Sequence, residues 1–313
     1  MDSTLAAQAR AILGSPRIRG KIVVLCEGDP LPLDPAGGPP SPQMYGRLEH
    51  TPDASFYAQC VPQDWQGWGL PRFFTCGGRS QVLEVFGELL TIHKRRPDES
   101  YLSPDKLFAL VDLDLQNASL PACGPCATTE DAHALLYSDG LVRPDVAASQ
   151  RIWVTALVHK EAFFVLPGAE ANWRDSPPYL DGAPLVLRDL YAKIAEALPR
   201  DGDLLANLPA LAERLQRFSA ASWLDTASAE GLRGSWLAAS QRGPEPGLVR
   251  ALLAVGKVKP FWLQIGPGPE LERDLSPSQC REQLELNLAR WIAERDPAEH
   301  PLAGFFAWLR SQR

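Results

Sequence analysis

Apolar residues gather in four short runs that predict the strands of a parallel sheet. Each run is continuous rather than alternating, which is typical of strands covered by helices on both faces. Helically spaced segments at 4–13, 53–60 and 80–92 lie between or before them, so strand and helix alternate along the first half of the chain. The pattern therefore predicts an α/β fold with a mostly parallel sheet flanked by helices. Its strands are expected at residues 21–26, 72–76, 106–112 and 152–158.

The pattern changes after Pro167, where helical spacing becomes dominant. We expect the last strand to continue through 160–166, and loops to occupy 225–246 and 256–278. We therefore divide the chain into an α/β domain at 1–167, with a Pro-rich insertion near 30–52, and a mainly α-helical C-terminal region at 168–313. The helices of the second region are expected at 185–198, 204–218, 248–255, 279–294 and 302–310.

Composition places the chain among folded proteins. Of its 313 residues, 45% are hydrophobic and 22% are charged, which is ordinary for a globular protein and excludes wholesale disorder. The longest apolar runs, such as 22–26, are too short to cross a bilayer. Asp2 and Arg10 interrupt the apolar N-terminal stretch, which argues against a signal peptide. The sequence thus predicts a cytoplasmic protein without a membrane partner.

The net charge of −7 is spread over the whole chain. Residues 1–160 carry 14 basic and 18 acidic side chains, and residues 161–313 carry 17 and 20. Without a basic tail or domain, a protein whose main task is to coat nucleic acid is disfavoured. A local basic groove, or a metal ion that bridges to phosphate, remains open.

One cysteine pair has a spacing that occurs in redox and zinc sites. Cys123 and Cys126 enclose Gly-Pro, but the preceding residues have the composition of a loop rather than of a strand leading into a helix. A zinc site needs a second Cys or His pair nearby, and only His133 is close in sequence. We predict that both thiols are free and dispensable.

Acidic residues follow two of the predicted strands. Glu27 and Asp29 come after the first strand, and Asp112 and Asp114 after the third. Residues two apart in a strand share a face, so Asp112 and Asp114 converge if the strand continues through them. We expect Glu27, Asp112 and Asp114 to meet at one sheet edge and to hold Mg²⁺ or Mn²⁺, since clustered carboxylates favour hard cations. For the Asp-x-Asp pattern alone, the alternative is a pair of solvated loop acids.

These residues resemble a known family. The stretches Val23 to Asp29, Gly77-Gly78 and Phe108 to Asp114 are similar to a TOPRIM domain, most of all to the overcoming-lysogenization-defect (OLD-like) nucleases and the related DUF4435 proteins. The likeness covers roughly residues 20–167 and extends to Asp53-Ala-Ser-Phe-Tyr and to His159-Lys160-Glu161. The family has only a few residues between Glu-Gly and the helix acid, whereas here about 24 separate Gly28 from Asp53. Either Asp29 or Asp53 therefore occupies that position.

The resemblance implies Mg²⁺- or Mn²⁺-dependent cleavage of nucleic-acid phosphodiesters. Glu27 is then a metal ligand or general base, and Asp112 and Asp114 are ligands. Asp29, Asp53 and Glu161 are further candidate ligands, and Lys160 is a candidate catalytic group that offsets phosphate charge. The implied partners are DNA or RNA, a separate ATPase chain (no Walker A pattern occurs here) and a second copy in a homodimer, in bacterial defence against phage. The alternative is a non-catalytic TOPRIM-like sensor or binding module for a nucleotide, nucleic acid or protein.

Overall fold

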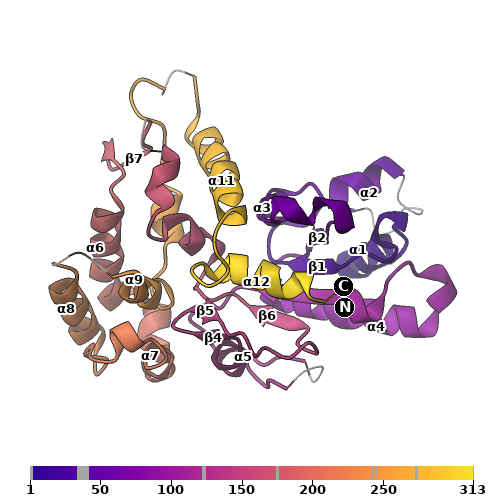
Figure 1. Cartoon of the computed structure of the whole chain (residues 1–313), viewed down its shortest axis with the longest axis horizontal. Coiled ribbons are helices and arrows are strands. Elements are labelled where there is room, and N and C mark those ends of the chain that lie inside the picture. The colour runs from indigo at the N-terminus through magenta and orange to yellow at the C-terminus, as the bar shows by residue number, and fades with distance from the viewer. Residues whose placement is uncertain are drawn as a thin grey trace.

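The computed structural model of the chain describes residues 3–33, 42–121, 125–173, 176–241, 243, 245–271 and 274–312. Its centre is a four-stranded sheet in the order β2-β1-β3-β6, with every neighbouring pair parallel (Figure 1). The four strands fall within the four predicted runs, so the α/β class and the parallel sheet are confirmed. Their bounds are β1 Val23–Cys26, β2 Arg72–Thr75, β3 Leu107–Val111 and β6 Ile152–Val154.

Helices flank this sheet. In the α/β half, α4 packs on β1, β3 and α1, while α3 packs on β2 and α5 on β6. The α/β half contains α1 Ser3–Leu13, α2 Pro42–Leu48, α3 Pro52–Gln59, α4 Arg79–Arg95 and α5 Thr129–Leu136, together with a small hairpin of β4 Tyr137–Ser138 and β5 Leu141–Val142.

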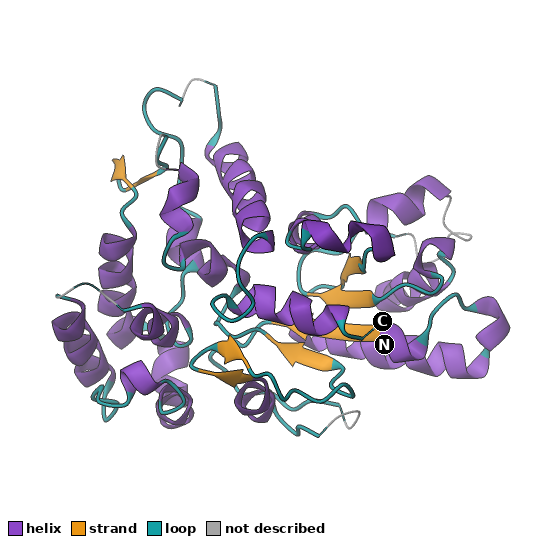
Figure 2. Cartoon of the chain, viewed as in Figure 1, coloured by secondary structure: helices purple, strands orange, loops and turns teal. Residues whose placement is uncertain are grey.

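The second half is mainly helical, as predicted, and Figure 2 shows most of the strands gathered on the other side of the molecule. Its elements are β7 Tyr179–Leu180, β8 Ala183–Pro184, α6 Leu187–Ala197, α7 Gly202–Leu215, α8 Ala229–Ser240, α9 Pro246–Leu253, α10 Lys259–Trp262, α11 Pro277–Ala293 and α12 Pro301–Arg310.

Local capping explains where several of these helices begin. At the start of α5, the Thr128 hydroxyl accepts a hydrogen bond from the Asp131 N–H, and the Asp131 carboxylate accepts one from the Thr128 N–H. Ser276 and Gln279 form the same reciprocal pair at the start of α11, where Pro277 occupies the first helical position. Such boxes satisfy N–H groups that a helix leaves unpaired.

Several segments differ from the sequence predictions. β6 ends at Val154, and residues 160–165 form a 3₁₀ helix rather than a continued strand. The reason is local: the Thr155 hydroxyl donates to the Leu157 carbonyl and accepts from the Leu113 N–H, which ends the ladder. The expected loops at 225–246 and 256–278 contain α8 and the short α10, and α2 lies within the Pro-rich segment near 30–52, of which residues 34–41 are outside the described residues.

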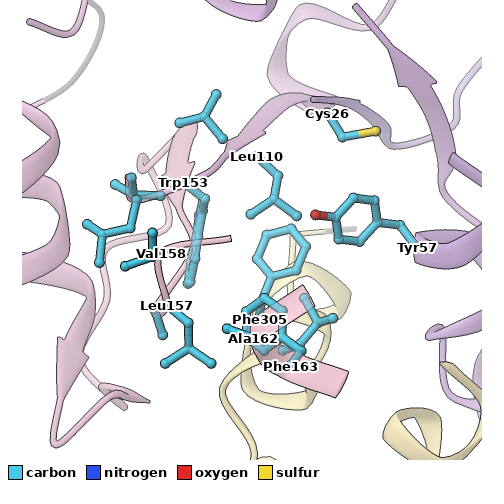
Figure 3. Packing of buried hydrophobic residues seen from close by; sticks show 14 of the residues in the cluster. Cys26, Tyr57, Leu110, Trp153, Leu157, Val158, Ala162, Phe163 and Phe305 are labelled. Carbon is cyan, nitrogen blue, oxygen red and sulfur yellow. The ribbon is translucent and has the colours of Figure 1, made fainter. Parts of the chain in front are cut away.

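One continuous hydrophobic core joins the two halves. The C-terminal α12 packs against the sheet, with the rings of Phe305 and Trp153 5.0 Å apart and those of Trp308 and Phe108 5.5 Å apart. Figure 3 shows Phe305 beside Leu110 and Trp153 in this cluster. Fully burying a large apolar side chain stabilises a fold by about 1.5–3 kcal/mol, so α12 is an integral part of the sheet's cover. The division at residue 167 stays a prediction.

Among the helices of the described ranges, none is both long enough and apolar enough to cross a membrane.

Candidate active site

A cavity of about 340 Å³ opens at the carboxyl end of the sheet. The turns after β1 and β3 border it, and these two strands are neighbours in the sheet. The chain continues from β1 to β2 at one edge of the sheet and from β3 to β6 at the other edge, so the strand order reverses between β1 and β3. Ligands of open parallel sheets bind at such a switch point. Five carboxylates line the cavity, from Glu27, Asp29, Asp53, Asp112 and Glu161.

Glu27 and Asp112 meet at this edge as the sequence predicts. The Asp112 backbone N–H donates a hydrogen bond of 2.8 Å to Glu27 Oε1. Burial, together with the nearby charge of Asp112, raises the pKa of Glu27 to about 8, although that N–H and the Arg79 guanidinium oppose the shift. Two acids this close are stabilised by a proton or by a cation. We call them the Glu27–Asp112 pair.

Two glycine turns hold the base of the cavity in place. Gly28 and Gly77 exchange backbone hydrogen bonds of 3.0 and 2.9 Å, which ties the turn after β1 to the turn after β2. Gly28 has φ +132°, and a Cβ there would lie only 2.1 Å from Asp53 Oδ2. Asp53 on α3 therefore lies directly against the Glu27-Gly28 turn, which requires glycine at position 28. Asp29 also borders the cavity, but its side chain is exposed.

Lys160 is held by two carboxylates. Its ammonium contacts Asp53 Oδ1 and lies 3.3 Å from Glu285 Oε2 on α11. The Trp262 Nε1–H donates a 3.1 Å hydrogen bond to the other Glu285 oxygen. Burial by itself lowers a lysine pKa, but Glu285 and Asp53 more than offset this, so the pKa of Lys160 is raised and the side chain is charged. Glu285 and Trp262 are not predictable as site residues from the sequence, since Glu285 occupies an ordinary helical position, Trp262 lies in an expected loop, and both are more than 100 residues away from Lys160.

Asp114 takes a different course from Asp112. β3 ends at Val111, and Asp114 adopts a left-handed conformation with φ +57°. Its carbonyl accepts a 2.8 Å hydrogen bond from Arg214, and its side chain does not line the cavity. The shared face expected for Asp112 and Asp114 required a strand that continues, which the turn prevents. The charge of Asp114 still contributes to the raised pKa of Glu27.

Two more groups come from the segment after β6: His159 lies near Asp112, and Glu161 lines the cavity. His159 Nδ1 lies 3.8 Å from Asp112 Oδ2. Burial raises the pKa of Glu161, although the charges of Lys160 and Lys259 oppose the shift. Both residues come from the segment that the sequence assigned to a strand, and the 3₁₀ helix brings Lys160 and Glu161 to the cavity together.

The carboxylates of the cavity fit one mode of metal binding and not another. Within the described ranges, no group of three or more His, Cys, Asp or Glu side chains is placed to hold an ion. Mg²⁺, however, keeps several waters and is bound by one or two carboxylates plus substrate phosphate. The Glu27–Asp112 pair matches that mode, with Asp53 also lining the cavity.

Cys126 does not line this cavity. Cys126 is buried and forms no disulfide, while Cys123 lies outside the described residues. Burial raises the pKa of the Cys126 thiol, which disfavours the reactive thiolate.

A scan against protein-family models finds no match to this chain, and searches of curated proteins and of solved structures find none either. The fold and the cavity define this chain as an α/β protein with an acidic site at the switch point of its sheet.

Proposed function

We propose that this protein is a Mg²⁺- or Mn²⁺-dependent nuclease with a TOPRIM-like domain that hydrolyses phosphodiesters of nucleic acid. The observation that supports this most is the Glu27–Asp112 pair, placed by adjacent parallel strands at the switch point and joined by the Asp112 N–H. The acidic cavity around the pair matches a reaction in which a cation mediates between protein carboxylates and phosphate. We also propose a role in phage defence, with an ATPase chain or a second copy of this chain as partner. Only the sequence resemblance supports this role.

The residues of the cavity have separable tasks in this reaction. Glu27 and Asp112 would hold the cation, which when bound supplies a polarised phosphate oxygen and an acidified water. If Asp112 holds the cation without Glu27, the Glu27 carboxylate beside it is placed to act as the general base that activates the water. The contact with Lys160 holds the Asp53 carboxylate against Gly28, so it faces the Glu27-Gly28 turn.

Incubation with plasmid, single-stranded DNA and tRNA tests the proposal, with Mn²⁺, with Mg²⁺ or with EDTA. We expect cleavage with a divalent cation, none with EDTA, and at least a hundredfold loss, about 2.7 kcal/mol of barrier, in Asp112→Asn and Glu27→Gln. Asp145→Asn is the matched control, because Asp145 is an exposed acid paired with Arg143 away from the cavity. Cleavage that survives in Asp112→Asn would refute the proposal.

A second candidate function is a non-catalytic binding or sensor module. The observation that favours it is Lys160, whose ammonium is already committed to Asp53 and Glu285 rather than available to a phosphate. In that case the same incubations show no cleavage. A nucleotide or oligonucleotide still binds to the wild-type protein, and substitutions at the cavity weaken that binding.

A further inference from the structure

The cavity contains two lysines, and their surroundings differ. The Lys160 ammonium has three N–H donors, and it contacts the carboxylates of Asp53 and Glu285 with only 13% of its side chain exposed. It also lies 5.4 Å from the centre of the Phe56 ring. Moving it toward a substrate would leave two partly buried carboxylates unpaired, which is costly. Lys160 therefore serves to position Asp53.

Lys259 is in the opposite situation. It is the first residue of α10, and its neighbours Val258 and Trp262 are buried, so the backbone that carries it is anchored. Trp262 is further fixed by its hydrogen bond to Glu285. The Lys259 side chain is exposed at the cavity, and its charge acts on Glu161. With the residues that the structure describes, Lys259 forms no ion pair, so its ammonium is available to an anion.

We infer that Lys259 binds a phosphate group of the substrate, and that this substrate is a single-stranded nucleic acid that enters the cavity one nucleotide at a time. The inference deepens the proposed nuclease function and rests on it. A lysine in the same cavity as a carboxylate-held metal ion suits a phosphodiester, because each of the two non-bridging oxygens that share its single negative charge would then have a partner. Lys259 comes from the mainly helical region, so both halves of the chain contribute to the site.

Charge and size favour a single strand over a duplex. A duplex presents dense phosphate charge, and proteins bind it with many basic contacts. Here the cavity has five carboxylates against one available lysine. The exposed basic run Lys94, Arg95 and Arg96 lies at the far end of the 17-residue helix α4, roughly 24 Å from its start at the cavity. A volume of about 340 Å³ accommodates one small-molecule-sized unit.

Binding of a cleavage-resistant strand tests the inference. The probe is a fluorescein-labelled phosphorothioate oligothymidylate, titrated by anisotropy in Ca²⁺ over a series of salt concentrations. We expect Lys259→Gln to weaken binding about three- to fivefold and to reduce the slope of log K against log salt by about 0.7, the contribution of one phosphate contact on a single strand. Lys259→Arg should restore both values, and a duplex of equal length should bind at least tenfold more weakly.

Lys94→Gln is the matched control, since it removes the same charge from an exposed position at the far end of α4. An unchanged salt slope in Lys259→Gln, or an equal change in Lys94→Gln, overturns the inference. Duplex binding as tight as single-strand binding overturns the choice of substrate. If wild type cleaves with Mn²⁺ but Lys259→Gln binds normally, the nuclease proposal stands and this inference fails. If binding depends on Lys259 while no cleavage occurs, the nuclease proposal fails and Lys259 is a phosphate contact of a binding module.

Discussion

Two groups of charged side chains contact the segment that follows β3, and they differ in how their charges are balanced. At Asp112 stands the Glu27–Asp112 pair, two acids joined by one backbone N–H at an open cavity. At Asp114 stands a buried cluster of Glu130, His133, Arg214 and Arg217, which we call the Glu130 cluster. The first is a pair of acids, whereas in the second two arginines contact one carboxylate, that of Glu130.

The Glu130 cluster is satisfied in detail. The fully buried Arg214 donates to Glu130 and to the carbonyls of Ala254 and Asp114. Arg217 donates to Glu130 and to His133 Nδ1, so His133 carries its proton on Nε2, which faces the Ala156 carbonyl at 3.3 Å. Burial and the two arginine charges lower the pKa of His133, which keeps the imidazole neutral.

The difference separates a structural role from a chemical one. A network of buried ion pairs resists the entry of a ligand, because its charged groups are already bonded to one another. Among the described residues, no lysine or arginine forms an ion pair with Glu27 or Asp112, so the pair is costly until a cation or proton arrives, and this makes it the candidate for chemistry. Perturbed pKa values occur in both groups, so they do not by themselves distinguish the two roles.

The largest expected effect comes from breaking the Glu130 cluster. Arg214→Met leaves the Glu130 carboxylate without its main partner and the carbonyls of Ala254 and Asp114 without a donor. We expect the free energy of unfolding to fall by about 3–5 kcal/mol, as for other broken buried ion pairs. Urea unfolding followed by circular dichroism measures it. A loss below about 1 kcal/mol would show that the cluster is not structural.

The next effect concerns cations at the Glu27–Asp112 pair. Mn²⁺ at a hundred times its dissociation constant should stabilise the fold by about 2.7 kcal/mol, since only the folded chain holds the pair together. Thermal melting with and without Mn²⁺ should show a rise of several degrees in wild type and in Asp145→Asn, and none in Asp112→Ala. A wild-type melting temperature that does not respond to Mn²⁺ contradicts a cation site at this pair.

An effect that is smaller per pH unit follows from the pKa of Glu27. Because the folded pKa of about 8 lies above the value of about 4.3 for an unfolded glutamate, the folded state holds the proton more tightly between these two pH values. The free energy of unfolding should therefore fall as pH rises through this window, with a slope of up to about 1.4 kcal/mol per pH unit. Glu161 contributes with the same sign, since its pKa is also raised.

Urea midpoints from pH 5 to pH 8, compared with Glu27→Gln, isolate this contribution. The glutamine keeps an oxygen that accepts the Asp112 N–H and removes only the titration. Identical pH profiles for the two proteins would contradict a raised Glu27 pKa. Mn²⁺ affinity should rise with pH over the same window, because the metal competes with the proton.

The smallest effect is expected for an exposed pair. Arg233 and Glu196 lie 2.5 Å apart on the surface of the helical half, where water and salt screen the attraction. Arg233→Met should leave the urea midpoint unchanged within error, which makes it the control for Arg214→Met. A shift comparable to that of Arg214→Met would mean that burial does not decide the strength of these pairs.

The sequence by itself determined the strands and two of the site residues. Continuous apolar runs require cover on both faces, and acids directly after β1 and β3 arrive at the same sheet edge whatever the loops do. Glu27 and Asp112 were therefore predictable from local pattern, and the Gly77-Gly78 turn after β2 was visible for the same reason.

Only the tertiary structure decided the rest of the site. Asp114 leaves the cavity because Thr155 ends the ladder and Arg214, 100 residues away, binds its carbonyl. Glu285 lies in a helix whose periodicity shows only that one face is buried, and Lys259 lies in a segment that the sequence predicts as a loop. Neither pattern shows which charged residue meets which partner. Such pairings depend on how two halves of a chain pack, and that information lies in long-range contacts rather than in any local run of residues.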